Sequence, residues 1–210
     1  MARSQESFNR PNPRFQPQPT VLIICEDTKS GKRYLEDACN QFRVGAQVEI
    51  IHCGKTDPKN IVLEAKRRKA KFDNVFCAID RDTHTTFDEA VQLALASPKV
   101  TLVVSHPCFE FWLLLHFRYT RKPYMRSGSD SPADVLIRDL CTYPNMTDYA
   151  KGNSASVFDL LFDLLPTARK NAHQAFSEAV SCDELNPSTE VHKLLDFLEN
   201  LGKPQPVTGA

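Results

Sequence analysis

Four short apolar runs, separated by segments with helical periodicity, dominate the first half of the sequence. They span residues 20–26, 46–54, 72–80 and 99–106 and are rich in β-branched side chains. They are apolar throughout and do not alternate with polar residues, which is typical of strands buried on both faces. Amphipathic helices are expected between them. This order predicts an α/β fold with a mostly parallel four-stranded sheet and helices on both faces.

The second half of the chain lacks any such run. Helical periodicity recurs there in residues 131–141, 154–165, 167–180 and 189–201. We therefore expect a small C-terminal helical lobe. The predicted organisation is a disordered, proline-rich tail, an α/β domain, the helical lobe and a flexible tail, in residues 1–19, 20–118, 119–200 and 201–210.

Charge and composition narrow the functional classes. The 26 basic and 26 acidic residues balance, which argues against a uniformly basic nucleic-acid coat. Residues 131–210 hold 6 basic and 11 acidic residues, so the excess of positive charge lies in residues 1–130 and favours a polyanionic partner there. No apolar stretch approaches membrane-spanning length, and the seven cysteines form no C-x-x-C pair. We expect a cytoplasmic protein without a membrane partner.

Acidic residues stand where two of the predicted strands end. Glu26 follows the first run, and Asp80 and Asp82 close the third. Parallel sheets bind ligands beyond the carboxyl ends of their strands, and residues two apart on a strand point the same way. Grouped carboxylates repel one another unless a cation neutralises them, and oxygen ligands suit Mg²⁺ or Mn²⁺. The alternative is local: Asp80 begins a turn and Asp82 caps the next helix.

Four segments resemble, in order, the segments of RloB-like proteins, a family that includes an abortive-infection protein. They are VLIICEDTKSGKRYL, VFCAIDRDTH, VVSHPCFEFWLLLHF and NPSTEVHKLLDFL, and the resemblance covers roughly residues 20–200. It implies a Toprim-like fold in which Glu26 is a general acid or base and Asp80 and Asp82 bind the divalent metal. It also implies a metal-dependent nuclease, cutting DNA or RNA in prokaryotic defence against phage.

The first motif departs from the family pattern. The family resembles C-E-G-x-x-T-E-x-x-Y, whereas this chain reads CEDTKSGKRY. Asp27 replaces the glycine, Ser30 the threonine and Gly31 the second glutamate, while Tyr34 is kept. The missing acid at position 31 favours one metal ion over two, and Asp27 is a candidate replacement ligand.

Glu110 and Lys151 are candidate contributors to catalysis. Glu110 lies in the apolar segment PCFEFW, where a buried carboxylate needs a cation, a metal or a hydrogen-bonding partner. The alternative is a favourable interaction with a helix amino end. Lys151 resembles a family lysine before a helix and is expected to stabilise phosphate charge in the transition state, or to cap the preceding segment. His84 is expected to orient an aspartate or the substrate.

Residues 117–126 mix cations with aromatic rings, the combination that a flexible nucleic acid would use. The candidate nucleic-acid contacts are Arg118, Tyr119, Arg121, Lys122, Tyr124 and Arg126. The alternative is a solvated loop.

Two functional hypotheses follow. The first is a Mg²⁺- or Mn²⁺-dependent nuclease. The second is a non-catalytic Toprim-like module that binds a nucleic acid or nucleotide and partners an ATPase or restriction system encoded in the same operon. The chain itself lacks an ATP-binding G-x-x-x-x-G-K-[ST] loop. Metal-dependent cutting that is lost in Asp80→Ala would distinguish the two.

Overall fold

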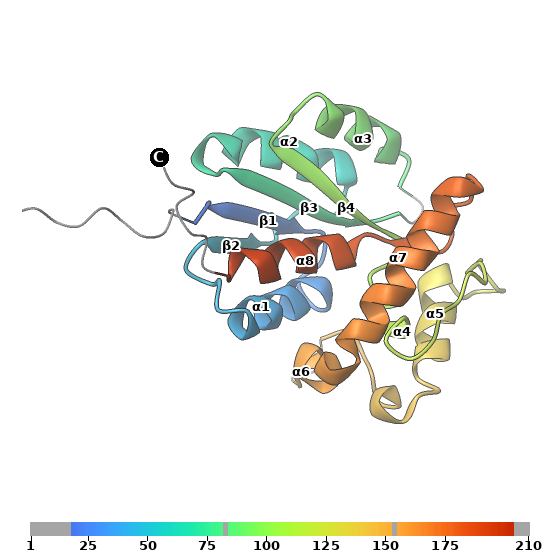
Figure 1. Ribbon diagram of the computed structural model, residues 1–210. Coiled ribbons are helices and arrows are strands. Elements are labelled where there is room, and N and C mark those ends of the chain that lie inside the picture. The colour runs from blue at the N-terminus through green and yellow to red at the C-terminus, as the bar shows by residue number, and fades with distance from the viewer. Residues whose placement is uncertain (1–17, 82–83, 153–154, 204–210) are drawn as a thin grey trace, which may run out of the picture.

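The chain forms a five-stranded mixed sheet in the computed structural model, which describes residues 18–81, 84–152 and 155–203. The strands are β1 (Val21–Cys25), β2 (Val48–Ile51), β3 (Asn74–Asp80), β4 (Val100–His106) and β5 (Ser188–Thr189). Their order is β2-β1-β3-β4-β5, and the first four are parallel (Figure 1). The α/β class is confirmed. The expected four-stranded sheet was wrong, because β5 joins β4 in the antiparallel direction.

β5 could not be read from a pattern of residues. It is two polar residues long, and its pairing consists of Thr189 opposite Ser105 and Ser188 opposite His106. The Ser105 and Thr189 hydroxyls also share a hydrogen bond of 2.9 Å. A strand this short has no apolar run or alternation, so it forms only because the chain returns to the sheet edge.

One face of the sheet is covered by α2 (Pro58–Arg68) and α3 (Phe87–Leu95) (Figure 1). α2 begins where Asp57 accepts the Asn60 N–H and proline occupies the first turn, a strong start signal. Its apolar stripe meets alternate residues of the strands. The buried cluster on this face includes Leu22, Ile24, Ile61, Val62, Ala65, Val75, Cys77, Ile79, Ala90, Ala94 and Val100.

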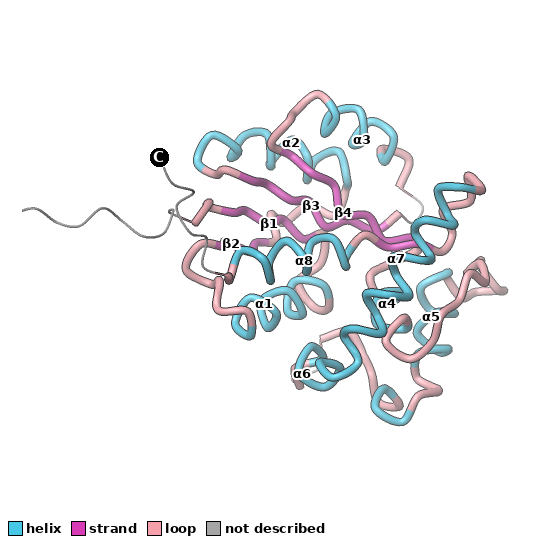
Figure 2. The backbone as a smooth tube through the Cα atoms, viewed as in Figure 1, coloured by secondary structure: helices cyan, strands magenta, loops and turns pink. Residues whose placement is uncertain are grey.

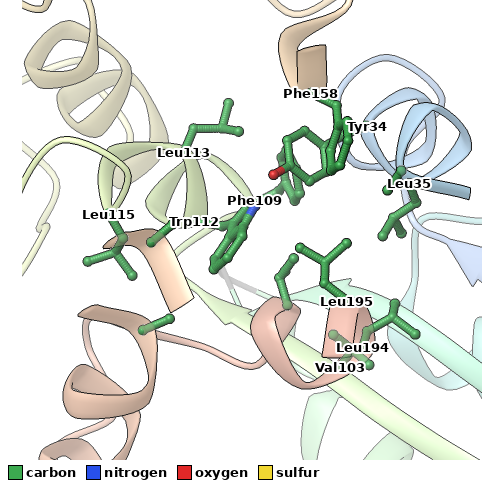
Figure 3. Close-up of a cluster of buried hydrophobic side chains, with 14 of the residues drawn as sticks. Tyr34, Leu35, Val103, Phe109, Trp112, Leu113, Leu115, Phe158, Leu194 and Leu195 are labelled. Carbon is green, nitrogen blue, oxygen red and sulfur yellow. The ribbon is translucent and has the colours of Figure 1, made fainter. Parts of the chain in front are cut away.

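The other face is covered by α1 (Gly31–Gln41) and by the last helix, α8 (Val191–Leu201). Figure 3 shows Tyr34 of α1, Phe109 and Trp112 near the end of β4, and Leu194 of α8 in one apolar cluster. α8 therefore packs on the sheet although it is the last of the predicted lobe helices. The division into domains stays a prediction.

The remaining helices gather at one end of the sheet (Figure 2). They are α4 (Glu110–Leu114), α5 (Pro132–Leu140), α6 (Val157–Leu161) and α7 (Leu165–Ser181). Short 3₁₀ turns occur at η2 (Lys69–Lys71), η3 (Pro144–Met146) and η4 (Phe162–Leu164). α4 is shorter than the apolar segment 107–117 suggests, and all five of its residues are buried. It anchors this group of helices to the end of β4.

Several predictions fall outside the described residues. These are most of the two tails, in residues 1–17 and 204–210, and Asp82. Within the part of the chain that the structure does describe, no helix combines the length and apolarity needed to cross a membrane.

Candidate functional site

Glu26 and Asp80 meet at the carboxyl edge of the sheet. β1 and β3 are neighbours, with Cys25 opposite Ala78, so the residues that follow lie side by side. Glu26 Oε2 accepts a hydrogen bond of 2.8 Å from the Asp80 backbone N–H, and Oε1 lies 3.6 Å from Nε2 of His84. The Glu26 side chain is 13% exposed. The structure thus brings together two of the three predicted metal ligands, and His84 stands beside them.

The third predicted ligand, Asp82, lies outside the described residues. Among residues 18–81, 84–152 and 155–203, no three His, Cys, Asp or Glu side chains form a group that would hold a metal ion. The metal site is therefore incomplete without Asp82, and metal binding stays a prediction.

The pKa of Asp80 is strongly perturbed. Its removal from water raises the pKa of its carboxyl group well above 3.8, and the neighbouring Glu110 and Glu26 carboxylates raise it further. Lys151 acts in the opposite direction but does not offset them. Burial is the main cause of this shift, so the Asp80 carboxyl group favours its neutral form in the absence of a cation.

Glu110 is fully buried at the start of α4 and has two partners. The Tyr149 hydroxyl donates to Oε1 at 3.0 Å, and the Lys151 ammonium lies 3.2 Å from Oε2 as an ion pair without hydrogen-bond geometry. Burial lowers the pKa of Lys151, but Glu110 and its acidic neighbours raise it above its ordinary value, so the lysine stays charged. Burial and Glu110 likewise raise the pKa of Tyr149, which keeps its phenol proton.

Asp27 and Gly31, the two main departures from the family motif, fit together. Asp27 Oδ1 accepts the N–H groups of Lys29 and Ser30 at 2.6 Å, and Oδ2 accepts that of Gly31 at 3.2 Å. A Cβ at position 31 would lie 3.3 Å from Asp27 Oδ2 and 3.5 Å from the Phe109 ring. The Asp27 carboxylate therefore holds the amino end of α1 and lies against the place where a side chain at position 31 would begin.

Most of the predicted nucleic-acid segment is tied to the protein itself. Arg118 pairs with Asp139, and the Tyr119 hydroxyl donates to Glu178. The Arg121 guanidinium donates to the carbonyl oxygens of Pro187 and Glu184.

Tyr124 and the remaining cations of this segment differ in exposure. The Tyr124 ring is 1% exposed and packs edge-on to Phe111, and its hydroxyl donates to Asp139 at 2.6 Å. Its face is therefore not available to stack on a base. Lys122 and Arg126 are exposed. A role in binding nucleic acid stays a prediction for the segment, with these two as its most accessible cations.

Sequence reasoning missed Tyr149. Its hydrogen bond to Glu110 links the loop that carries Lys151 to the start of α4. Its nearness to Lys151 in the sequence was the only available signal, because nothing local indicates that the loop folds back over residues 109–110.

The fold and this edge define an α/β protein with acidic side chains gathered where the parallel strands end. The chain belongs to the RloB-like protein family, whose model matches residues 21–198. This match confirms the resemblance found in the sequence and includes all five strands. No curated protein and no solved structure was found to match.

Proposed function

We propose that this protein is a Mg²⁺- or Mn²⁺-dependent nuclease that hydrolyses phosphodiester bonds in DNA or RNA, with a Toprim-like arrangement of its acids. The observation that carries the proposal is the contact of Glu26 with Asp80 at one sheet edge, near enough to the buried Glu110 and its partner Lys151 for both to act on Asp80 electrostatically. An excess of carboxylate oxygens in a partly desolvated place suits a hard divalent cation.

Asp80 and Glu26, together with Asp82, would hold the ion. The chemistry that a divalent ion held by these residues would supply is that of a Lewis acid, which would lower the pKa of water and offset the charge of the phosphoryl oxygens. Glu26 would accept the proton of the attacking water, a role supported by the Asp80 N–H, which fixes one of its oxygens, and by His84, which lies near the other.

Lys151 would act on the phosphate directly. Its ammonium is positioned by Glu110, whose second oxygen is fixed by Tyr149. A cation held in place before the reaction stabilises the negative charge that develops on the phosphoryl group without reorganising. Glu110 and Tyr149 are therefore positioning residues for the lysine in this mechanism.

The cellular part of the proposal rests on the family alone. It is a cytoplasmic role in prokaryotic defence against phage, with an operon-encoded ATPase or restriction system as a partner. A non-catalytic module that binds nucleic acid or nucleotide is the second candidate. It is favoured by the missing acid at position 31 and by the use of Asp27 to hold α1.

The test is cleavage of end-labelled single-stranded DNA, duplex DNA and RNA with Mg²⁺ or Mn²⁺. Wild type is compared with Asp80→Asn and with Asp163→Asn, an exposed aspartate in the helical lobe. We expect metal-dependent cutting that falls by about 100-fold or more in Asp80→Asn, because even indirect partners of metal ligands change activity about 10- to 100-fold. Equal rates in both variants would contradict the proposal, and tight binding without cutting would favour the binding module.

A further inference from the structure

A cavity of about 390 Å³ lies beside the acidic edge, between α1 and residues 149–152 and 155–157. This volume is within the range of small-molecule binding sites. Phe109, which is 7% exposed, forms an apolar part of the wall, while Lys29 and Arg33 contribute cations. The cavity therefore offers both an apolar surface and positive charge to one ligand.

The cavity adjoins the proposed reaction site through two side chains. Tyr149 lines it and donates to Glu110 on the other side. Phe109 lines it and also lines a second cavity of about 20 Å³ that is bordered by Glu26 and Asp80. A group bound in the larger cavity would consequently be a close neighbour of the acids.

The two cations are held against the loop that carries Lys151. The Arg33 guanidinium donates to the Gly152 carbonyl oxygen at 2.9 Å. Carbons of the Lys29 side chain lie 3.5 to 3.7 Å from the point where a Cβ at position 152 would stand. Both side chains remain exposed. They are thus partly ordered before any ligand arrives, which lowers the cost of binding an anion.

The acids that line the cavity are already engaged. Glu36 pairs with Lys32, and Asp37 accepts a hydrogen bond of 2.8 Å from the Ser156 hydroxyl. Lys151, beside Tyr149, is paired with Glu110 and adds no net charge. The charges that remain at the cavity are those of Lys29, Arg33 and Asp37, and their net positive charge suits a ligand with one negative charge and an apolar ring.

We propose that this cavity takes one unpaired nucleotide next to the phosphodiester that is cleaved, an inference that rests on the proposed function. The base lies against the exposed part of Phe109, and its phosphate meets Lys29 and Arg33. A base inside a duplex is stacked and cannot enter such a cavity unless it is flipped out. The protein therefore acts on single-stranded or locally unpaired nucleic acid and discriminates against continuous duplex.

The experiment measures binding by the 210-residue chain without metal, so that cleavage does not interfere. Fluorescence anisotropy reports the affinity for a labelled single strand of about 12 nucleotides and for its duplex, since single-strand sites span about 4 to 16 nucleotides. Arg33→Ala removes one cation, and Ala155→Trp fills the cavity without changing charge. Arg67→Ala on α2, on the opposite face of the sheet, is the matched control.

We expect the wild-type protein to bind the single strand at least about 5-fold more tightly than the duplex. Both cavity variants should weaken single-strand binding by a similar factor, because about 5-fold is the least that one stacked base contributes to affinity. Arg67→Ala should change the affinity for the single strand less than 2-fold, because solvent and salt screen a distant surface charge. Equal affinity for single strand and duplex, or wild-type binding by Ala155→Trp, would overturn the proposal. Thermal unfolding checks each variant, and Lys29→Ala decides the matter if Ala155→Trp does not fold.

Failure of this inference differs from failure of the proposed function. Selective binding of single strands by a protein that cuts nothing with Mg²⁺ or Mn²⁺ would support the cavity and refute the nuclease. Metal-dependent cutting at equal rates on single strands and duplex would support the nuclease and refute the cavity.

Discussion

Replacing Lys151 with methionine tests the buried ion pair on which the proposed mechanism depends. The substitution keeps a long apolar side chain but removes the cation from the fully buried Glu110, which keeps its hydrogen bond from the Tyr149 hydroxyl. Breaking a fully buried pair costs about 3 to 5 kcal/mol. The Lys151 side chain is 37% exposed, so solvent screens the pair and the expected cost is about 1 to 2 kcal/mol. For a chain of this size the melting temperature should fall by about 2 to 8 °C.

The assay is urea denaturation, monitored by circular dichroism, of the four proteins of a double-mutant cycle that combines Lys151→Met with Glu110→Gln. Once Glu110 is neutral, the lysine substitution should cost no more than about 0.5 kcal/mol, which gives a coupling energy of about 1 kcal/mol. Lys193→Met is the matched control, because Lys193 pairs with Glu190 on the surface and is 50% exposed. Equal costs for the two lysine substitutions, or additive effects of Lys151→Met and Glu110→Gln, would refute the reasoning.

Three further predictions concern the site and the nucleic-acid segment. Because the pKa of Asp80 is raised above 3.8, the folded protein holds this proton longer than the unfolded chain, and its contribution to stability is lost as pH rises. Asp80→Asn should therefore have a higher melting temperature than metal-free wild type at neutral pH. In calorimetry the difference between the two melting temperatures should shrink toward pH 3.8, and a difference that stays constant with pH would contradict this prediction. Asp27→Ala should lower the free energy of unfolding by about 1 kcal/mol, because the backbone N–H groups at the start of α1 lose their acceptor. The affinity for Mn²⁺ should not change, and a loss of affinity would show that Asp27 is a metal ligand. Replacing both Lys122 and Arg126 with alanine should reduce the slope of log affinity against log salt concentration by about one to two, the effect of losing one to two phosphate contacts. An unchanged slope would exclude both residues from the nucleic-acid interface.

The central strands β1 and β3 were predictable because burial on both faces demands continuous apolar runs, whereas the edge strand β2, which has no buried residue, was predictable from its short apolar run alone. β1, β2, β3 and β4 each lie within the predicted ranges. β5 was not predictable, since two polar residues at a sheet edge acquire strand geometry only from pairing with Ser105 and His106. The packing of α8 beside α1 was hidden for a related reason: its apolar stripe fits a sheet as well as it fits other helices.

The candidate site was likewise predictable from the sequence only in part. Glu26 and Asp80 could be placed together from the sequence, because neighbouring parallel strands end at one edge. The contact of Lys151 with Glu110 spans 41 positions. The apolar surroundings of Glu110 in the sequence indicated that it needs a partner, but only the family resemblance pointed to Lys151. Asp27 was a candidate ligand by residue type, whereas its hydrogen bonds serve the start of α1.

Titration of the metal-free protein with Mn²⁺ in a calorimeter tests most directly whether the carboxyl edge of the sheet is a metal site. Wild type should bind a single ion per chain, and Asp80→Asn and Glu26→Gln should each abolish the binding heat, while Asp163→Asn leaves it intact. Binding by Asp80→Asn with wild-type affinity, or no binding by wild type, would contradict the account.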